Sequence, residues 1–359
     1  MVSNSKSASN SNNPVITRHY SLDGIRGMAC SMVLISHIFG NQYKMWFGGL
    51  GKMGVWLFFV LSAFLLSNYF FSKPKRSLDP LEWVNYFTRR FLRVFPIFII
   101  VLVIYRLDYF LVENDQSFID HILLKVGNGH FWTIPVEMKY YILLPIVIVS
   151  VIYLFSLNWL FSVVGLAVLI CLHQWSIPAE DTQIASISLM TYLPVFVSGS
   201  IAALIHTKLI DICIPKKIRL FMDVIAFIII AAIIISLPAV FSEFFVQIPS
   251  TFYDKKFIYY GILYSIFILC VMHGQGYSRK LFESKVLRYI GIYSFSAYLI
   301  HPIILYNVRK YIPDVTLMGV IIMVVTIIIS STILYHVFER PFTKINILSS
   351  RKKKLNIAQ

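Results

Sequence analysis

Long apolar runs dominate the sequence and decide what this chain can fold into. About ten of them reach the length of about 17 to 25 residues that a helix needs to cross a bilayer. They lie near 24–43, 54–72, 94–112, 134–156, 159–175, 188–207, 220–241, 257–273, 289–308 and 317–337. Only 14% of the residues are charged, whereas soluble domains carry about 25%. The sequence therefore predicts an all-α polytopic membrane protein with about ten transmembrane helices.

The charge balance predicts the orientation of the chain. The net charge of +15 arises from 32 Lys and Arg residues against 17 Asp and Glu residues. In a soluble protein this excess would suggest nucleic-acid binding, but no nucleic-acid-binding motif is present. With a cytoplasmic N-terminus, the inner segments hold about three times as many basic residues as the outer loops, as the positive-inside rule requires. We therefore expect both termini in the cytoplasm and no nucleic-acid partner.

The two ends of the chain differ from its middle. Residues 1–20 are mostly polar and rich in Ser and Asn, which is typical of a disordered cytoplasmic tail rather than a signal peptide. Residues 21–345 are expected to form a single membrane domain, followed by a basic cytoplasmic tail at 346–359. The four cysteines are scattered, without a CxxC pair or a histidine at ligand spacing. The pattern predicts neither a disulfide framework nor a metal site.

The first apolar run contains ionisable residues, which are costly in hydrocarbon and therefore mark a candidate site. Asp23 and Arg26 lie at its inner end, and His37 follows Arg26 by eleven residues. In a helix this spacing leaves an angular offset of about 20° and a rise of about 16 Å. Arg26 and His37 therefore share one face, as in a path from the cytoplasmic surface into the membrane. The alternative is that Arg26 snorkels to the interface and His37 bonds a neighbouring carbonyl.

A second histidine is expected at a similar depth. His301 lies about twelve residues into the run near 289–308, and Pro302 follows it. Proline removes a backbone donor and kinks a helix. The two histidines are therefore candidates to line one cavity, with the alternative that His301 bonds a carbonyl freed by the kink.

Other charges lie within or beside the runs. Glu137 follows the start of the fourth run and needs a partner from another segment, because Lys139 projects from a different face. Arg106 is one candidate partner. For Arg106, Asp108 and Asp223, structural pairing is the simpler interpretation than chemistry.

The inner segment before the third run carries an arginine cluster. Arg89, Arg90 and Arg93 lie within five residues of one another in YFTRRFLRVFP. Guanidinium groups bind phosphate through two parallel hydrogen bonds. Such a cluster also binds anionic lipid head groups or simply fixes the topology, and its charge alone favours that interpretation.

Several motifs together resemble a known family. The segments LDGIRGMACSMVLISH, GVWLFFVLSAFLLS, YFTRRFLRVFP, FWTIPVEMKYYILLP, YLPVFVSGSIAAL, YIGIYSFSAYLIHPII and LYHVFERPF occur in this order. They are similar to those of the integral membrane acyltransferase family 3, whose members O-acylate cell-surface carbohydrates, antibiotics and signal glycans. The resemblance extends from about residue 20 to 345. Some relatives add an extracytoplasmic SGNH-type domain, and the short tail here predicts a stand-alone form.

The resemblance implies roles for particular residues. The family's Arg-x10-His pair, required for activity, falls on Arg26 and His37, and its Arg-x-x-Arg motif falls on Arg90 and Arg93. Its Glu before an aromatic run falls on Glu137. The Tyr-x-x-His stretch falls on Tyr298 and His301, which with Asp23 are expected to support or line the pocket.

The combined hypothesis is an O-acyltransferase in the bacterial cytoplasmic membrane. Acyl-CoA, expected to be acetyl-CoA, binds from the cytoplasm with its phosphates on Arg89, Arg90 and Arg93, and no metal is used. Arg26 holds donor phosphate or polarises the oxyanion. His37 acts as general base on a carbohydrate hydroxyl or as transient acyl carrier. Glu137 orients that imidazole or contacts the sugar.

A transporter or flippase for a glycan or lipid is the alternative function. The same spans, basic inner face and buried charges suit both classes. Ion-coupled transporters, however, place paired acids and broken helices near the midplane. Here the densest group of charges begins at the inner surface and includes arginines suited to phosphate, which favours the acyltransferase.

Overall fold

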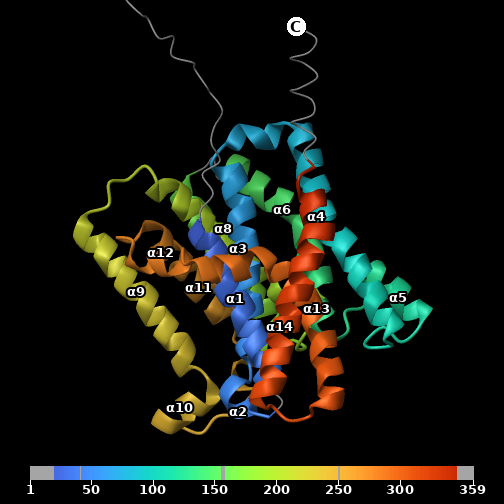
Figure 1. Ribbon diagram of the computed structural model, residues 1–359. Coiled ribbons are helices and arrows are strands. Elements are labelled where there is room, and N and C mark those ends of the chain that lie inside the picture. Colours follow the sequence, from blue (N-terminus) through green and yellow to red (C-terminus); the bar gives the residue numbers. More distant parts are fainter. Residues whose placement is uncertain (1–19, 41, 155–157, 250, 346–359) are drawn as a thin grey trace, which may run out of the picture.

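The protein is an all-α polytopic membrane protein (Figure 1). The computed structural model describes residues 20–40, 42–154, 158–249 and 251–345, and every regular element in these ranges is helical. The expected tails at 1–20 and 346–359 lie outside the described residues, apart from Tyr20. The sidedness of the termini stays a prediction.

Eight helices in the described ranges are long and apolar enough to cross a membrane. They are α1 (Tyr20–Phe39), α3 (Leu50–Phe71), α6 (Thr133–Val149), α7 (Trp159–Ser176), α8 (Leu189–Leu209), α9 (Lys216–Ile235), α13 (Lys285–Tyr311) and α14 (Leu317–Leu334). Some are extended at an end by short helical segments, among them α2 (Lys44–Phe47), η2 (Gly129–Trp132), η3 (Ser150–Leu154), η6 (Tyr335–Glu339) and α15 (Arg340–Thr343).

Two further helices account for the remaining apolar runs. Helix α11 (Phe257–His273) is apolar but has only 17 residues. Helix α4 (Pro80–Leu107) is long, but its first half carries the arginine cluster. Each of the ten runs thus falls on a helix, while the number that meets the length and composition of a span is eight rather than about ten.

Small residues bring α1 and α13 into backbone contact. A Cβ atom added to Gly27 would lie 2.0 Å from the Leu287 carbonyl oxygen, and one added to Gly291 would lie 1.8 Å from the Asp23 carbonyl oxygen. In a membrane, where lipid is as apolar as a side chain, such close packing drives helix association. The approach places the faces of α1 and α13 that carry His37 and His301 side by side.

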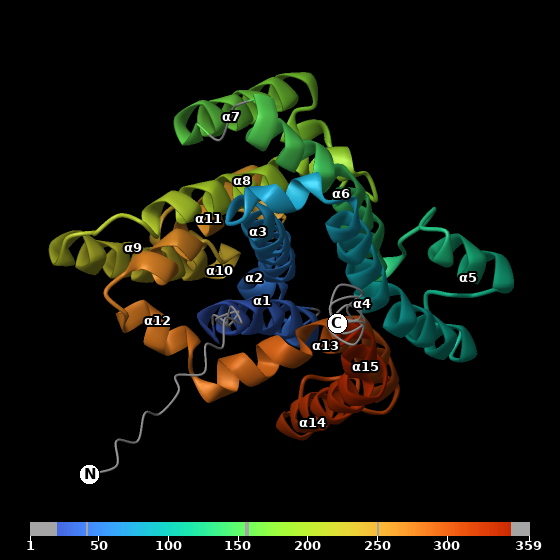
Figure 2. The same ribbon diagram turned by 90° about the horizontal axis from the view of Figure 1, so that it is seen from above.

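The bundle has a buried centre and a lipid-exposed rim. In the most apolar stretches of α3 and α8, 67% and 72% of the residues are buried, against 11% and 22% in α7 and α9. Seen from above, α7 and α9 lie at the periphery around α1 and α3 (Figure 2). The centre of the bundle therefore positions the polar groups, and the peripheral helices face lipid.

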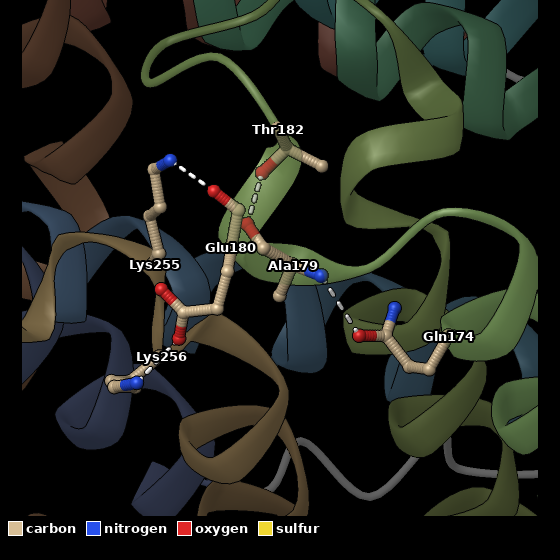
Figure 3. Close-up of polar contacts among 6 residues, drawn as sticks. All are labelled: Gln174, Ala179, Glu180, Thr182, Lys255 and Lys256. Carbon is tan, nitrogen blue, oxygen red and sulfur yellow. Dashed lines mark hydrogen bonds and ion pairs between the residues drawn. The ribbon is translucent and has the colours of Figure 1, made fainter.

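Short helices and turns complete the fold. They are η1 (Pro74–Leu78), α5 (Asp115–Ile122), η4 (Ala179–Asp181), α10 (Pro238–Phe244), η5 (Phe252–Lys255) and α12 (Tyr277–Phe282). Two of the connecting loops hold each other in place, because Lys255 donates to the Glu180 carbonyl and Lys256 pairs with the Glu180 carboxylate (Figure 3). The loop that contains Glu180 continues to Ala185, which lines one of the cavities described next.

Candidate active site

Pro302, which lies inside the continuous helix α13, orients His301. Proline has no N–H, so the carbonyl of Tyr298, four residues earlier, loses its helical donor. The Nδ1 atom of His301 lies 2.8 Å from this oxygen. A carbonyl can only accept, so Nδ1 carries the hydrogen of the neutral ring. The Nε2 atom of His301 is therefore left as an acceptor.

A tyrosine hydroxyl fills the next gap in the same helix. Tyr105 of α4 donates to the Leu299 carbonyl at 3.1 Å and accepts from the Ile303 N–H at 3.2 Å. Insertion of a side chain into the helical ladder is a recognised cause of a kink. Pro302 and Tyr105 thus interrupt successive hydrogen bonds of the helix, and Tyr105 satisfies both the Leu299 carbonyl and the Ile303 N–H.

His37 and His301 form the central pair of the site. Their atoms Nδ1 and Nε2 lie 2.6 Å apart, and the two rings are nearly parallel, with centroids 4.9 Å apart and an interplanar angle of 11°. Because His301 Nε2 accepts, His37 Nδ1 donates, and the neutral His37 ring keeps a lone pair on Nε2. His301 is fully buried, whereas His37 is exposed to a cavity. The two histidines are in direct contact, but His301 lines neither of the cavities described below, so the expectation that both line one cavity holds only for His37.

One cavity, which we call the arginine cavity, collects the basic residues of α1 and α4. It has a volume of about 250 Å³ and is lined by Arg26, Arg89, Arg90 and Arg93. Arg26 also pairs with Asp23, at 3.4 Å between Nη1 and Oδ1. The arginines predicted from two separate segments are therefore brought together, and clustered guanidinium groups of this kind attract anions.

Glu137 is the only carboxylate among the residues that line the arginine cavity. Its Oε1 atom accepts a hydrogen bond from the Ser62 hydroxyl at 2.9 Å and another from the Tyr141 hydroxyl. Arg106 pairs instead with Asp115, at 3.1 Å between Nη2 and Oδ1. The sequence-based pairing of Glu137 with Arg106 is therefore wrong. The group that contacts the His37 imidazole is His301 rather than Glu137.

The second cavity, which we call the histidine cavity, lies on the other side of Tyr298. Its volume is about 570 Å³, and its lining includes His37, His130, Lys52 and Arg309. Tyr298 and Val55 line both cavities. These two shared residues make the cavities neighbours, and His37 lines the histidine cavity but not the arginine cavity.

Arg309 fixes the end of α1 next to His37. Its Nη2 atom donates to the carbonyl oxygens of His37 and Ile38, at 2.7 and 2.9 Å. A cation at a helix C-terminus satisfies free carbonyls and interacts favourably with the helix dipole. Arg309 therefore holds the backbone that carries the His37 ring.

The remaining intramembrane charges have structural partners. Asp108 accepts from Asn307 Nδ2 at 2.7 Å. Asp223 accepts from the backbone N–H groups of Gly276, Tyr277 and Ser278 at the start of α12. The structural interpretation of Arg106, Asp108 and Asp223 is in keeping with these contacts.

The sequence interpretation missed three residues of the site. His130, Tyr105 and Arg309 contact the part of α13 next to Pro302 or the end of α1. His130 precedes the Phe-Trp pair of the recognised segment, which was a usable signal. Tyr105 and Arg309 carried no signal, because their roles arise from contacts between distant helices.

His121 supports the turn that carries His130. It is fully buried in α5, donates from Nδ1 to the Ser117 carbonyl at 2.7 Å and accepts from the Asn128 N–H at 3.3 Å. Burial lowers the pKa of His121 below its usual value. The folded state therefore favours the neutral ring, and stability is lost as the pH falls below the ordinary histidine pKa of about 6.5.

We accordingly expect the unfolding temperature of the purified protein to fall between about pH 6.5 and 5. In His121→Gln, whose amide supplies one donor and one acceptor without titrating, this fall is expected to be shallower. Thermal unfolding of both proteins across this pH range tests the role of His121. Equal pH dependence of the two proteins would contradict it.

Sequence comparison identifies the family of this chain. This chain belongs to acyltransferase family 3, whose family model, described as an acyltransferase domain, matches residues 19–336. The match confirms the family expected from the motifs. No solved structure matches the chain significantly.

Curated relatives are named as O-acetyltransferases. The chain is 25% identical over 320 residues to the peptidoglycan O-acetyltransferase OatA of Listeria monocytogenes. The aligned region covers 79% of this chain and 49% of that protein. The chain is also 24% identical over 357 residues to a putative O-acetyltransferase of Staphylococcus aureus. That alignment covers 90% of this chain and 57% of the relative. The chain thus spans about half the length of the curated relatives that it matches.

Proposed function

We propose that the protein moves an acetyl group from acetyl-CoA, bound from the cytoplasm, to a hydroxyl of a cell-surface or lipid-linked carbohydrate in the bacterial cytoplasmic membrane. The observation that carries this proposal is the His37–His301 contact of 2.6 Å beside a cavity lined by four arginines. The family supports acyl transfer. The names of the relatives support acetyl as the group and carbohydrate as the acceptor.

The arginine cavity suits the donor. Coenzyme A carries phosphate groups, and clustered guanidinium groups bind phosphates through charge-assisted hydrogen bonds. Arg89, Arg90 and Arg93 belong to the basic segment that the positive-inside rule assigns to the cytoplasm. Arg26 lines the same cavity from α1, eleven residues from His37, so it is positioned between phosphate binding and the reaction centre.

The tautomer of the histidine pair suits the transfer step. The Nε2 lone pair of His37 accepts the proton of the acceptor hydroxyl while the hydroxyl oxygen attacks the thioester carbonyl. The C–S bond breaks, the new C–O ester bond remains, and the thiolate of CoA takes the proton from His37. His301 accepts a hydrogen bond from His37 Nδ1, which stabilises the imidazolium formed on the way. An acyl-histidine route uses the same lone pair as a nucleophile.

A test of this function uses the purified protein in liposomes with acetyl-labelled acetyl-CoA and carbohydrate acceptors. We expect label to appear in the carbohydrate, and the surface glycan of cells that carry the gene to contain more acetyl by mass spectrometry than that of cells without it. Movement of labelled glycan across the liposome membrane, without acyl-CoA consumption, would instead support the transporter alternative.

A further inference from the structure

A third histidine lies beside the catalytic pair. His130 belongs to η2, is 7% exposed, and its ring centroid lies 5.5 Å from that of His301. Its Nε2 atom lies 3.1 Å from the Leu299 carbonyl oxygen, which can only accept. In the neutral ring, Nε2 therefore carries the hydrogen, and Nδ1 carries a lone pair.

That lone pair has no hydrogen-bond partner among the described residues. Leaving a buried polar atom unsatisfied costs free energy, so such atoms in native proteins call for an explanation. The same ring lines the histidine cavity, as does His37. The surrounding side chains cover Nδ1 in this structure, so a ligand hydroxyl that enters from this cavity and reaches Nδ1 would satisfy the orphaned acceptor.

The backbone of His130 is tied to the wall between the cavities. Its carbonyl accepts from the Tyr298 hydroxyl at 2.7 Å, and Thr133 donates to that hydroxyl at 3.1 Å. The position of the His130 ring is thus fixed relative to the pair by two contacts, one to Leu299 and one to Tyr298. A ring fixed in this way is suited to selecting a ligand.

The rest of the cavity suits a sugar rather than a purely apolar ligand. Lys52 and Arg309 place polar groups in its lining, and Lys52 is held by an ion pair with Asp254 at 2.5 Å. Tyr306 and Phe110 stack with centroids 4.3 Å apart and supply a flat aromatic surface. Ligand sites combine such apolar surfaces with a few fixed polar groups that set orientation.

We infer that the histidine cavity binds the carbohydrate acceptor. The hydroxyl that is to be acetylated faces His37, and a second hydroxyl of the same sugar donates a hydrogen bond to Nδ1 of His130. His130 is then a specificity-determining residue, and the enzyme selects acceptors by a pair of hydroxyls on one sugar. The inference rests on the proposed function.

Two substitutions separate the roles of the two ring nitrogens. In His130→Gln, the amide nitrogen reaches the position of Nε2 and keeps the bond to Leu299, but the acceptor at Nδ1 is lost. In His130→Asn, the amide oxygen occupies the position of Nδ1, but the bond to Leu299 is lost. If His130 has a purely structural role, acetyl transfer should fall more in His130→Asn. If His130 binds the carbohydrate, acetyl transfer should fall more in His130→Gln.

The probes are methyl glycosides of glucose, N-acetylglucosamine, N-acetylmuramic acid and galactose, with the monodeoxy analogues of whichever the wild type acetylates best. We expect His130→Gln to raise the KM for the acceptor about ten-fold, with the KM for acetyl-CoA unchanged. In the wild type, removal of the second hydroxyl is expected to lower kcat/KM about ten- to hundred-fold. In His130→Gln, kcat/KM should be the same for the deoxy sugar and for its parent sugar.

The outcomes distinguish the two proposals. Acetylation of a glycoside by the wild type, with unchanged acceptor KM and unchanged deoxy discrimination in His130→Gln, would overturn the role of His130 and leave the acetyltransferase function intact. A wild type that transfers acetyl to no carbohydrate would overturn the proposed function, and the inference would fall with it. His206→Gln is the matched control, because His206 forms a separate pair with His273 and lines neither cavity.

Discussion

His37→Ala is expected to lower acetyl transfer by about a hundred- to ten-thousand-fold, the usual contribution of a positioned general base or acid. The reason is that the exposed Nε2 lone pair of His37, set by the 2.6 Å contact with His301, has no substitute in the variant. The amount of folded protein in the membrane should stay unchanged, because the His37 side chain lies on a cavity surface and not in the packed core.

The measurement is labelled acetyl transfer per mole of protein, with the folded fraction determined by size-exclusion chromatography in detergent. His206→Gln is again the control, because it removes one histidine of a similar pair that lies away from both cavities. Near wild-type turnover in His37→Ala would end the assignment of this residue. Rapid acid quenching after addition of labelled donor shows whether label becomes bound to the protein, and retention of label on His37 would identify the acyl-histidine route.

The double variant Arg90→Gln/Arg93→Gln is expected to raise the KM for acetyl-CoA about a hundred-fold or more, because each charge-assisted hydrogen bond is worth about 1.5–3 kcal/mol. Both guanidinium groups line the arginine cavity, and Arg90 Nε is buried without a partner among the described residues. The acceptor KM should not change.

Acetyl-pantetheine, which lacks the nucleotide phosphates, provides the decisive comparison. The wild type should prefer acetyl-CoA strongly over this donor, and the double variant should lose most of that preference. Arg106→Gln is the control, because Arg106 pairs with Asp115 and lines neither cavity. If the double variant kept the full preference for acetyl-CoA, the phosphates would have to bind elsewhere.

The sequence was sufficient for features that depend on a single helix. Hydrophobic runs locate all ten apolar helices because each run is a local property of the chain. The depth of His37 and His301 follows from residue counting along two helices, and their contact agrees with it. Eight of these helices meet the length and composition of a span, whereas α11 has 17 residues, at the lower end of the length that crosses a bilayer, and α4 carries the arginine cluster.

Contacts between side chains of different helices could not be predicted by counting residues along one helix. Arg106 was expected to meet Glu137 because both are isolated charges, but Asp115 lies only nine residues from Arg106 and on its own side of the bundle. Glu137 instead meets Ser62 of α3. Neither hydroxyl partner of this carboxylate differs in the sequence from dozens of other hydroxyl groups, so only the packed structure identifies them.

Helix α4 links the arginine cavity to the part of α13 that carries His301. Its first half carries Arg89, Arg90 and Arg93, and Tyr105, about three turns further along, is bonded to the Leu299 carbonyl and the Ile303 N–H of α13. The turn that these two bonds clamp is the one that orients His301. Any displacement of α4 would therefore be passed through Tyr105 to the turn of α13 that holds His301.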